Sequence, residues 1–153
     1  MAALGVCEEE EATVPQGGSV LITVAVRNAG NVPGNVRVCI FVAAAGVLTD
    51  PWDYWALNYD TWFNDIITYY GEEEADYHMF YRDFPWTLQP GETKSIMQPV
   101  NTYISDLGKY YETGWYDVAV AAELFDENWE PYWAGDRLVG DSVMCRNAVR
   151  ITP

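Results

Sequence analysis

Two runs of alternating apolar and polar residues, separated by a dense turn, constrain this chain more than any other feature of its sequence. Within Ser19–Asn28 every second residue is apolar, and residues 36–42 repeat the pattern with Arg37 on the opposite face. Asparagine, glycine and proline crowd residues 28–34 between the runs. A period of two predicts two half-buried β-strands joined by a turn. The expected inward residues are Val20, Ile22, Val24 and Val26 in the first run, and Val36, Val38, Ile40 and Val42 in the second.

Later segments repeat this theme. Gly- and Pro-containing turns precede further alternating runs, and a long run from Trp115 to Phe125 places Tyr116 and Val118 on one face. Short strands of this kind predict an all-β chain folded as a single-domain antiparallel β-sandwich of about seven strands. The other expected strands cover about residues 6–14, 77–86, 94–100 and 142–152.

An aromatic-rich insertion at about residues 43–87 breaks the strand pattern. Asp50 and Pro51 are typical of a helix N-cap and first helical position, and aromatic and aliphatic residues then recur at helical spacing. Gly71 is suited to end that helix, and Glu72–Glu74 would follow as a solvated acidic patch. The insertion is therefore expected to be partly helical. The stripe consists of Trp55, Tyr59, Trp62, Ile66 and Tyr69 or Tyr70.

Three short motifs resemble the CARDB family and related prokaryotic Ig-like domains. Val24–Asn31 resembles the family's V-x-V-x-N-x-G-N strand and turn, and Leu88–Thr93 resembles its L-x-P-G-E-T turn. Gly114–Val118 resembles the G-x-Y-x-V start of the penultimate strand, where Tyr116 would form a tyrosine corner. The resemblance implies an Ig-like sandwich, a fold that hosts many functions.

The chain departs from the family pattern in two places, and its specific function is expected there. Residues 126–133 form a longer and more aromatic turn before the last strand, and the insertion at 43–87 is also longer than in the family.

The charge balance excludes several classes of partner. The 153 residues include 23 Asp and Glu against 8 Lys and Arg, a net charge of −15. Such a surface repels nucleic-acid phosphates and anionic membranes, and no apolar run is long enough to span a bilayer. An acidic surface that is merely soluble or binds cations, and a halophilic origin, are both consistent with this composition.

Residues 1–14 carry no secretory signal. Use without export and a missing leader remain open alternatives. The same segment is a candidate flexible arm that neighbouring subunits could exchange.

Catalytic chemistry finds little support in the sequence. The single histidine, His78, lies in an aromatic stretch and is expected to be structural, and no phosphate-binding glycine motif is present. The three cysteines, Cys7, Cys39 and Cys145, lack zinc-site spacing. Buried thiols and one inter-strand disulfide both remain open. We expect a protein that is not an enzyme and needs no cofactor.

Calcium is the one metal for which the sequence offers a site. Carboxylate and amide oxygens crowd the loop region after Phe125, and oxygen ligands on loops suit Ca²⁺. No EF-hand spacing occurs, and solvated loop acids are the alternative interpretation. The candidate ligands are Asp126, Asn128, Asp136 and Asp141, with Glu127 beside them.

Aromatic residues are the strongest functional signal, because 7 Trp and 11 Tyr exceed what one sandwich core uses. They could form a second small core over one sheet, a protein–protein interface, or a sugar-stacking surface. The candidate interface or ligand residues are Trp52, Trp55, Tyr59, Trp62, Tyr69, Tyr70, Trp129, Tyr132 and Trp133.

These observations favour a structural subunit of archaeal or bacterial type. It would form protein–protein contacts, mainly with copies of itself, in a virion or at the cell surface. The alternative is a carbohydrate-binding or adhesive module of a cell-surface protein, which predicts exposed coplanar aromatic rings and affinity for a polysaccharide.

Overall fold

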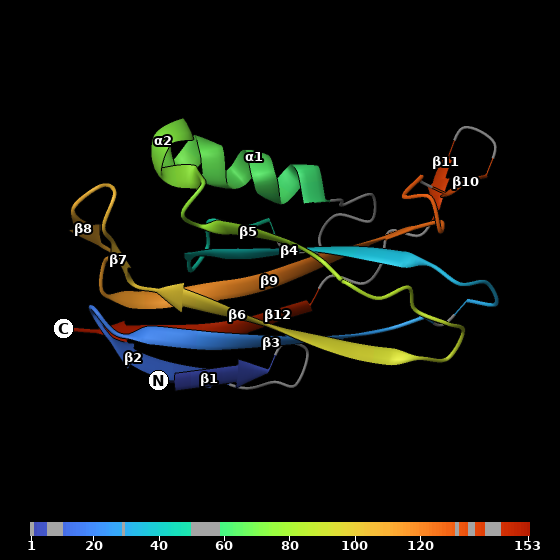
Figure 1. The fold of residues 1–153 in the computed structure, drawn as a ribbon. Helices are drawn as coiled ribbons and strands as arrows, with labels where there is room; N and C mark the ends of the chain where they lie inside the picture. Colours follow the sequence, from blue (N-terminus) through green and yellow to red (C-terminus); the bar gives the residue numbers. More distant parts are fainter. Residues whose placement is uncertain are drawn as a thin grey trace.

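The computed structural model is built mainly of β-strands and has three layers, with two helices on one side and two sheets below them (Figure 1). The prediction of a mostly β chain is confirmed. The structure describes residues 2–5, 11–28, 30–49, 59–130, 132–134, 137–139 and 145–153. Only the backbone is described at residues 2–5, 59–60, 123–124, 132–134, 137–139 and 145–147.

The middle layer is a five-stranded sheet with the order β2-β12-β9-β4-β5. The long strands β4 and β9 form its centre and pair antiparallel over their whole length. Their neighbours β12 and β5 also pair antiparallel with them. The strands span Glu11–Pro15 (β2), Asn35–Ala44 (β4), Met79–Asp83 (β5), Gly114–Phe125 (β9) and Cys145–Thr152 (β12).

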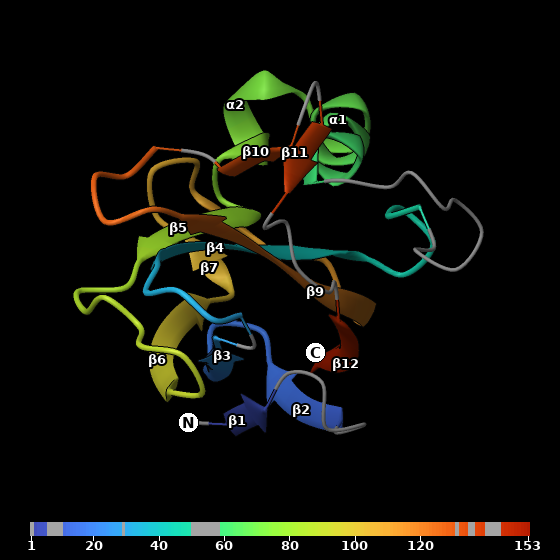
Figure 2. The same cartoon turned by 90° about the vertical axis from the view of Figure 1, so that its right-hand side faces the viewer.

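A three-stranded sheet with the order β1-β3-β6 covers one face of this central sheet. Its strands are Ala2–Gly5 (β1), Ser19–Arg27 (β3) and Thr93–Asn101 (β6). Figure 2 shows how the two sheets curve around the space between them. The inward residues of β3, β4 and β9 fill that space, and the predicted inward rows of both runs lie in this first core, with Val26 packed at its edge.

The turn between β3 and β4 crosses from one sheet to the other. Asn28 is buried, and its side-chain amide donates to Val32 O (2.8 Å) and to Leu88 O (3.0 Å). These bonds tie the crossing to the turn that precedes β6. At the start of β9, Tyr116 Oη donates to Glu112 O (2.9 Å), which confirms the tyrosine-corner hydrogen bond expected there.

The prediction of a purely antiparallel fold is wrong at the N-terminal strands. β1 pairs parallel with β3, and β2 pairs parallel with β12. The single strand expected over about residues 6–14 is likewise wrong in its bounds, because two short strands lie on either side of residues 6–10. The candidate exchangeable arm thus contributes a strand to each sheet of its own chain.

The helices α1 (Tyr59–Tyr70) and α2 (Glu72–Ala75) cover the other face of the central sheet. Gly71 ends α1 with a φ of 84°, a conformation that glycine adopts without strain. The expected helix start at Asp50 and Pro51 lies outside the described residues. A second core lies beneath the helices and consists of Cys39, Phe41, Ala43, Leu48, Trp62, Ile66, Ala75, Met79, Ala119 and Ala121.

Two small hairpins complete the structure. One consists of β7 (Tyr103–Ile104) and β8 (Lys109–Tyr110), and the other of β10 (Tyr132–Ala134) and β11 (Arg137–Val139). Neither hairpin was predicted from the sequence. The first hairpin lies at the same end of the molecule as α2 (Figure 1) and forms part of a cavity described below.

Candidate functional site

The aromatic candidates do not form one surface. Trp52 and Trp55 lie outside the described residues, and only the backbone is described for Tyr59, Tyr132 and Trp133. The other four fall in three different environments: Trp62 in the second core, Tyr69 and Tyr70 at the end of α1, and Trp129 in the loop after β9.

Trp62 is a core residue. Its side chain is fully buried, its ring meets Phe41 edge-on with centroids 5.6 Å apart, and Nε1 donates to Thr49 O (2.8 Å). It therefore anchors α1 to the sheet and offers no surface to a partner while the helix is docked. This matches the interpretation that the insertion builds a second small core.

Trp129 lies on a tight turn and is 38% exposed. Its φ is 61°, in the left-handed region. Asp126 holds the turn, because its Oδ1 accepts from the backbone N–H groups of Asn128 (2.8 Å) and Glu130 (2.9 Å). The indole packs against Phe125, and the Arg37 guanidinium lies 5.8 Å from its ring centroid. Part of the Trp129 ring is thus already in contact with Phe125 and Arg37 of the same chain.

Asp126 and Asn128 act in this turn, and Asp136 and Asp141 lie outside the described residues. Among the residues that the structure describes, no cluster of three or more His, Cys, Asp or Glu could hold a metal ion. The calcium hypothesis stays a prediction.

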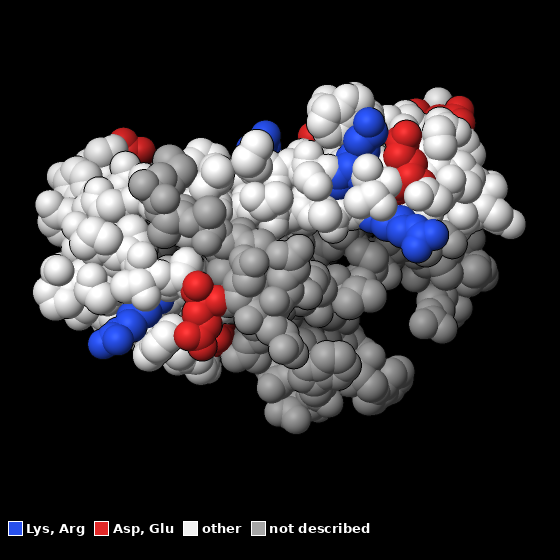
Figure 3. Space-filling model, turned by 90° about the horizontal axis from the view of Figure 1, so that it is seen from below, with Lys and Arg blue, Asp and Glu red and all other residues white. Residues whose placement is uncertain are grey.

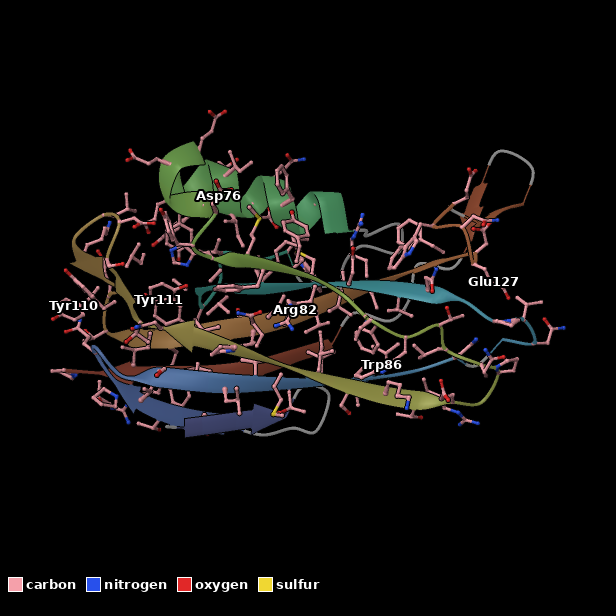
Figure 4. The ribbon with its side chains drawn as sticks, viewed as in Figure 1. Asp76, Arg82, Trp86, Tyr110, Tyr111 and Glu127 are labelled. Carbon is pink, nitrogen blue, oxygen red and sulfur yellow. The ribbon has the colours of Figure 1, made fainter. Side chains whose placement is uncertain are left out.

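Tyr69 and Tyr70 line a cavity of about 290 Å³. It lies between the end of α1, α2, the β7–β8 hairpin and the start of β9. Half of the ten lining residues are tyrosines: Tyr69, Tyr70, Tyr110, Tyr111 and Tyr116. In Figure 4, Tyr110 lies at this end of the molecule and Tyr111 lies further inward. The charged and titratable lining residues are Glu74, His78, Lys109 and Glu112.

A stack of four rings forms the inner wall. His78 lies between Tyr70 and Tyr111, with centroid distances of 3.7 and 4.5 Å, and Tyr116 continues the stack 5.5 Å beyond Tyr111. The Tyr111 hydroxyl donates to Tyr77 O, while Tyr70 Oη accepts from Ala44 N (2.9 Å). The stack thus connects the helices to β4 and β9.

His78 is almost fully buried, and both of its ring nitrogens have partners. Nδ1 lies 2.9 Å from Val42 O, and Nε2 lies 3.0 Å from Glu74 Oε2. A backbone carbonyl can only accept, so Nδ1 carries a hydrogen. Burial lowers the pKa of the His78 imidazole, against the hydrogen bonds to Glu74 and Val42, which raise it. The expectation of a structural histidine agrees with this placement.

Glu74 is the charge centre of the cavity. It lies on α2, and its other oxygen, Oε1, accepts from Lys109 Nζ on β8 (2.5 Å). Burial raises the pKa of the Glu74 carboxyl, but hydrogen bonds from Lys109 and His78 outweigh that effect and lower it. The expectation that Glu72–Glu74 form a solvated patch is therefore wrong for Glu74, whose side chain points inward.

The buried tyrosines remain protonated over the ordinary pH range. Burial raises the pKa of the Tyr70 hydroxyl to about 12, and it also raises the pKa values of Tyr111 and Tyr116. The tyrosine rings of the wall are therefore neutral, and the charged side chains beside them are the carboxylates of Glu74 and Glu112 and the ammonium group of Lys109, with the His78 imidazole bonded to Glu74.

Sequence reasoning found Tyr69 and Tyr70 but missed the rest of the cavity. Tyr110, Tyr111 and Glu112 belong to a short hairpin and loop with no apolar period, and Glu74 reads as one of three consecutive acids. One usable signal was the adjacent pair Tyr110–Tyr111, because neighbouring tyrosines beside Lys109 and Glu112 are unusual in a solvated loop.

A second candidate site is the outer face of the three-stranded sheet. β1, β3 and β6 contain no Asp or Glu, whereas α1 and α2 carry five acids and no Lys or Arg. Figure 3 shows the molecule from the side of this sheet, where the described atoms are mostly uncharged. Five registered pairs form the outer rows of β3 and β6: Ser19 with Asn101, Leu21 with Pro99, Thr23 with Met97, Ala25 with Ser95, and Arg27 with Thr93.

No protein-family model, curated protein or solved structure matches this chain. Among the described residues, no helix has the length and hydrophobicity needed to cross a membrane.

Proposed function

We propose that this chain is a non-enzymatic structural subunit that assembles with copies of itself in a virion or at a cell surface, and that the outer face of β1, β3 and β6 makes the contact. The observation that carries this proposal is the absence of acidic residues from these three strands in a chain with a net charge of −15. Two copies repel each other across acidic surfaces, so an acid-free face is where they approach at the lowest electrostatic cost.

The side chains of this face suit a contact. Met97 is 58% exposed at the centre of β6, where it is paired with Thr23, and Arg82 of β5 donates to its carbonyl oxygen at 3.1 Å. Two copies of this face bury the methionine against each other, while Arg27, the charged residue of the outer rows, lies at the end of β3. The same face leaves the acidic helical layer pointing away from the contact.

The size of the face predicts a weak pairwise contact. β3 and β6 have nine residues each and β1 has four, so the three strands cover at most roughly 350 Å², from spacings of about 4.8 Å between strands and 3.3 Å between residues. A stable interface buries about 800 Å² on each partner. Assembly is therefore expected to depend on protein concentration and to gain strength when many contacts form together.

The order of the strands supports an Ig-like sandwich as the scaffold, in line with the three sequence motifs. In an Ig sandwich one sheet contains strands A, B and E, and the other contains G, F, C and C′. The orders β1-β3-β6 and β12-β9-β4-β5 correspond to these series, but β1 pairs parallel with β3, where an Ig sheet is antiparallel. In this comparison β1 takes the place of strand A in one sheet, and β2 is an additional N-terminal strand in the other sheet.

Size-exclusion chromatography with light scattering tests the proposal over a series of protein and salt concentrations. We expect the 17.3 kDa monomer at low concentration and larger species at high concentration and high salt, because salt screens the repulsion. Negative-stain images of the large species should show an ordered assembly.

A matched pair of variants locates the contact. Met97→Glu places a carboxylate on the acid-free face and is expected to keep the chain monomeric. Tyr81→Glu also introduces a carboxylate, at a site of similar exposure, 49%, on the helix-covered face of the central sheet. This variant should leave assembly unchanged. A wild type that stays monomeric throughout, or equal assembly by wild type and Met97→Glu, would overturn the proposal.

A further inference from the structure

We propose that the tyrosine-lined cavity at the α2 end of the molecule binds a small organic cation, specifically a methylated ammonium group. This inference concerns a different site from the sheet contact and does not depend on it. It rests on the lining of the cavity, the angles between its rings and the charges at its rim.

The lining is aromatic and electron-rich. Five tyrosines surround a space of about 290 Å³, and the face of an aromatic ring carries negative potential that attracts a cation. Tyr69 and Tyr110 remain 59% and 49% exposed, so their rings are accessible at the mouth. The inner rings stack face to face with His78 and with one another, so the ring faces offered to a cation are those of Tyr69 and Tyr110.

The angles between the rings favour a compact cation over a sugar. A sugar ring stacks on a flat platform, whereas a compact cation is best surrounded by rings at steep angles to each other. At the mouth, the rings of Tyr69 and Tyr70 are inclined by 84°.

The charges also favour a cation. Glu74 and Glu112 contribute two carboxylates, and Lys109 contributes one ammonium group, which pairs with Glu74. A positively charged group thus already occupies the Glu74 side of the cavity. Glu112 is exposed at the rim, and the net charge of −15 raises the local concentration of any cation.

A methylated ammonium group fits better than a metal ion or a primary amine. It is weakly hydrated and large enough to contact several rings at once, and aromatic cages are the usual means of recognising it. The probe is choline, and its uncharged control is 3,3-dimethylbutan-1-ol, in which carbon replaces the nitrogen. Binding is followed by the NMR signals of the tyrosine rings at low salt and low protein concentration, where the chain is monomeric.

We expect choline to shift the ring signals of Tyr69 and Tyr110 in a saturable and salt-sensitive manner, and the uncharged isostere to bind much more weakly. Tyr110→Ala should weaken choline binding about two- to fivefold, the range for loss of one exposed cation–π contact. Tyr81→Ala is the matched control, because Tyr81 has the same 49% exposure but lies on β5, outside the cavity.

Lys109 gives the sharpest test, because the expected sign is unusual. Lys109→Gln removes the built-in cation and leaves Glu74 available, so choline binding should tighten about two- to fivefold. Lys109→Arg keeps the charge and should not tighten binding. A neutral or anionic ligand would gain nothing from the loss of Lys109.

Three outcomes overturn the proposal. Equal binding of choline and its isostere would show a merely apolar cavity. Binding of a neutral monosaccharide in the absence of choline binding would show a sugar site. No saturable response of the Tyr69 and Tyr110 signals to choline, in both the wild type and Lys109→Gln, would show that the cavity binds no such cation.

Discussion

The central sheet is covered by β1, β3 and β6 on one side and by α1 and α2 on the other, and the two covers differ in both core and surface. The β cover packs aliphatic side chains against the sheet and carries no acids. The helical cover is anchored by Trp62 and Ile66, carries five acids, and meets the sheet edge through the polar cluster around Glu74 and His78. A single sheet thus supports an acid-free cover, where we propose association, and an acidic cover, beside which we propose ligand binding.

The largest expected effects separate the two cores. Trp62→Ala should cost about 4 kcal/mol, and Ile22→Ala about 3 kcal/mol, because each leaves a cavity in a packed core. Hydrogen exchange should show that Trp62→Ala opens mainly the helical cover, while Ile22→Ala lowers protection throughout both sheets.

Tyr69→Ala, a truncation of an exposed ring on the same helix, serves as the control and should change stability by less than about 0.5 kcal/mol. Equal and uniform loss of protection in both core variants would show that the two covers form one cooperative unit.

Removal of the inward acid should come next. Glu74→Ala takes a charged hydrogen-bond partner from buried His78 and from Lys109, at an expected cost of about 2 kcal/mol near neutral pH. The pKa of Glu74 is lowered from its ordinary value of 4.5, so its contribution is fully present above that value and is lost as the pH falls through the folded-state pKa. Denaturant titrations should therefore show the two proteins converging in acid. A constant difference between pH 7 and pH 3 would contradict the assignment.

A smaller effect is expected where the two sides meet. Tyr116 lies in the first core and also ends the ring stack of the cavity. Tyr116→Phe removes the hydroxyl that donates to Glu112 O and should cost about 1 kcal/mol. Tyr110→Phe, on an exposed ring, is the comparison and should be close to neutral. A neutral Tyr116→Phe would mean that the tyrosine corner contributes shape alone.

The smallest effect is expected for an outward acid. Asp83 pairs with Arg37 at 2.6 Å, but both side chains are almost half exposed. Asp83→Asn should change the free energy of unfolding by less than about 0.5 kcal/mol, since solvent screens such a pair. Thermal melts of Asp83→Asn and Glu74→Ala, recorded side by side, compare the two losses of stability. A loss for Asp83→Asn as large as that for Glu74→Ala would refute the distinction between inward and outward acids.

The two covers also differ in how far the sequence predicts them. The strands β3, β4, β6 and β9 follow from alternation and from their Gly and Pro turns, because a half-buried strand imposes a period of two. The run Cys39–Ala44 is apolar without interruption, which is typical of a strand buried on both faces. The alternating pattern accounts for only one of those faces, so it does not predict which face the helix covers.

The cavity was harder to predict for a physical reason. Its walls come from Ala44, residues 69–78 and residues 109–116, which are brought together by the docking of α2 on the sheet edge. No periodic pattern within these segments indicates that they lie together in the fold. The parallel pairing of β1 and β2 is equally non-local, because nothing in their short sequences specifies the direction of a distant partner.

The parallel pairing of β2 with β12 determines when the central sheet can be completed during synthesis. Glu11 is matched with Ala148 and Val14 with Ile151, so β2 leaves the ribosome long before its partner exists. The last pairing of the central sheet must wait for nearly the whole chain, and contacts between such distant residues slow folding. Until β12 is synthesised, the edge of β9 that faces away from β4 has no paired strand. The β12 strand of a neighbouring nascent chain could then pair with that edge equally well.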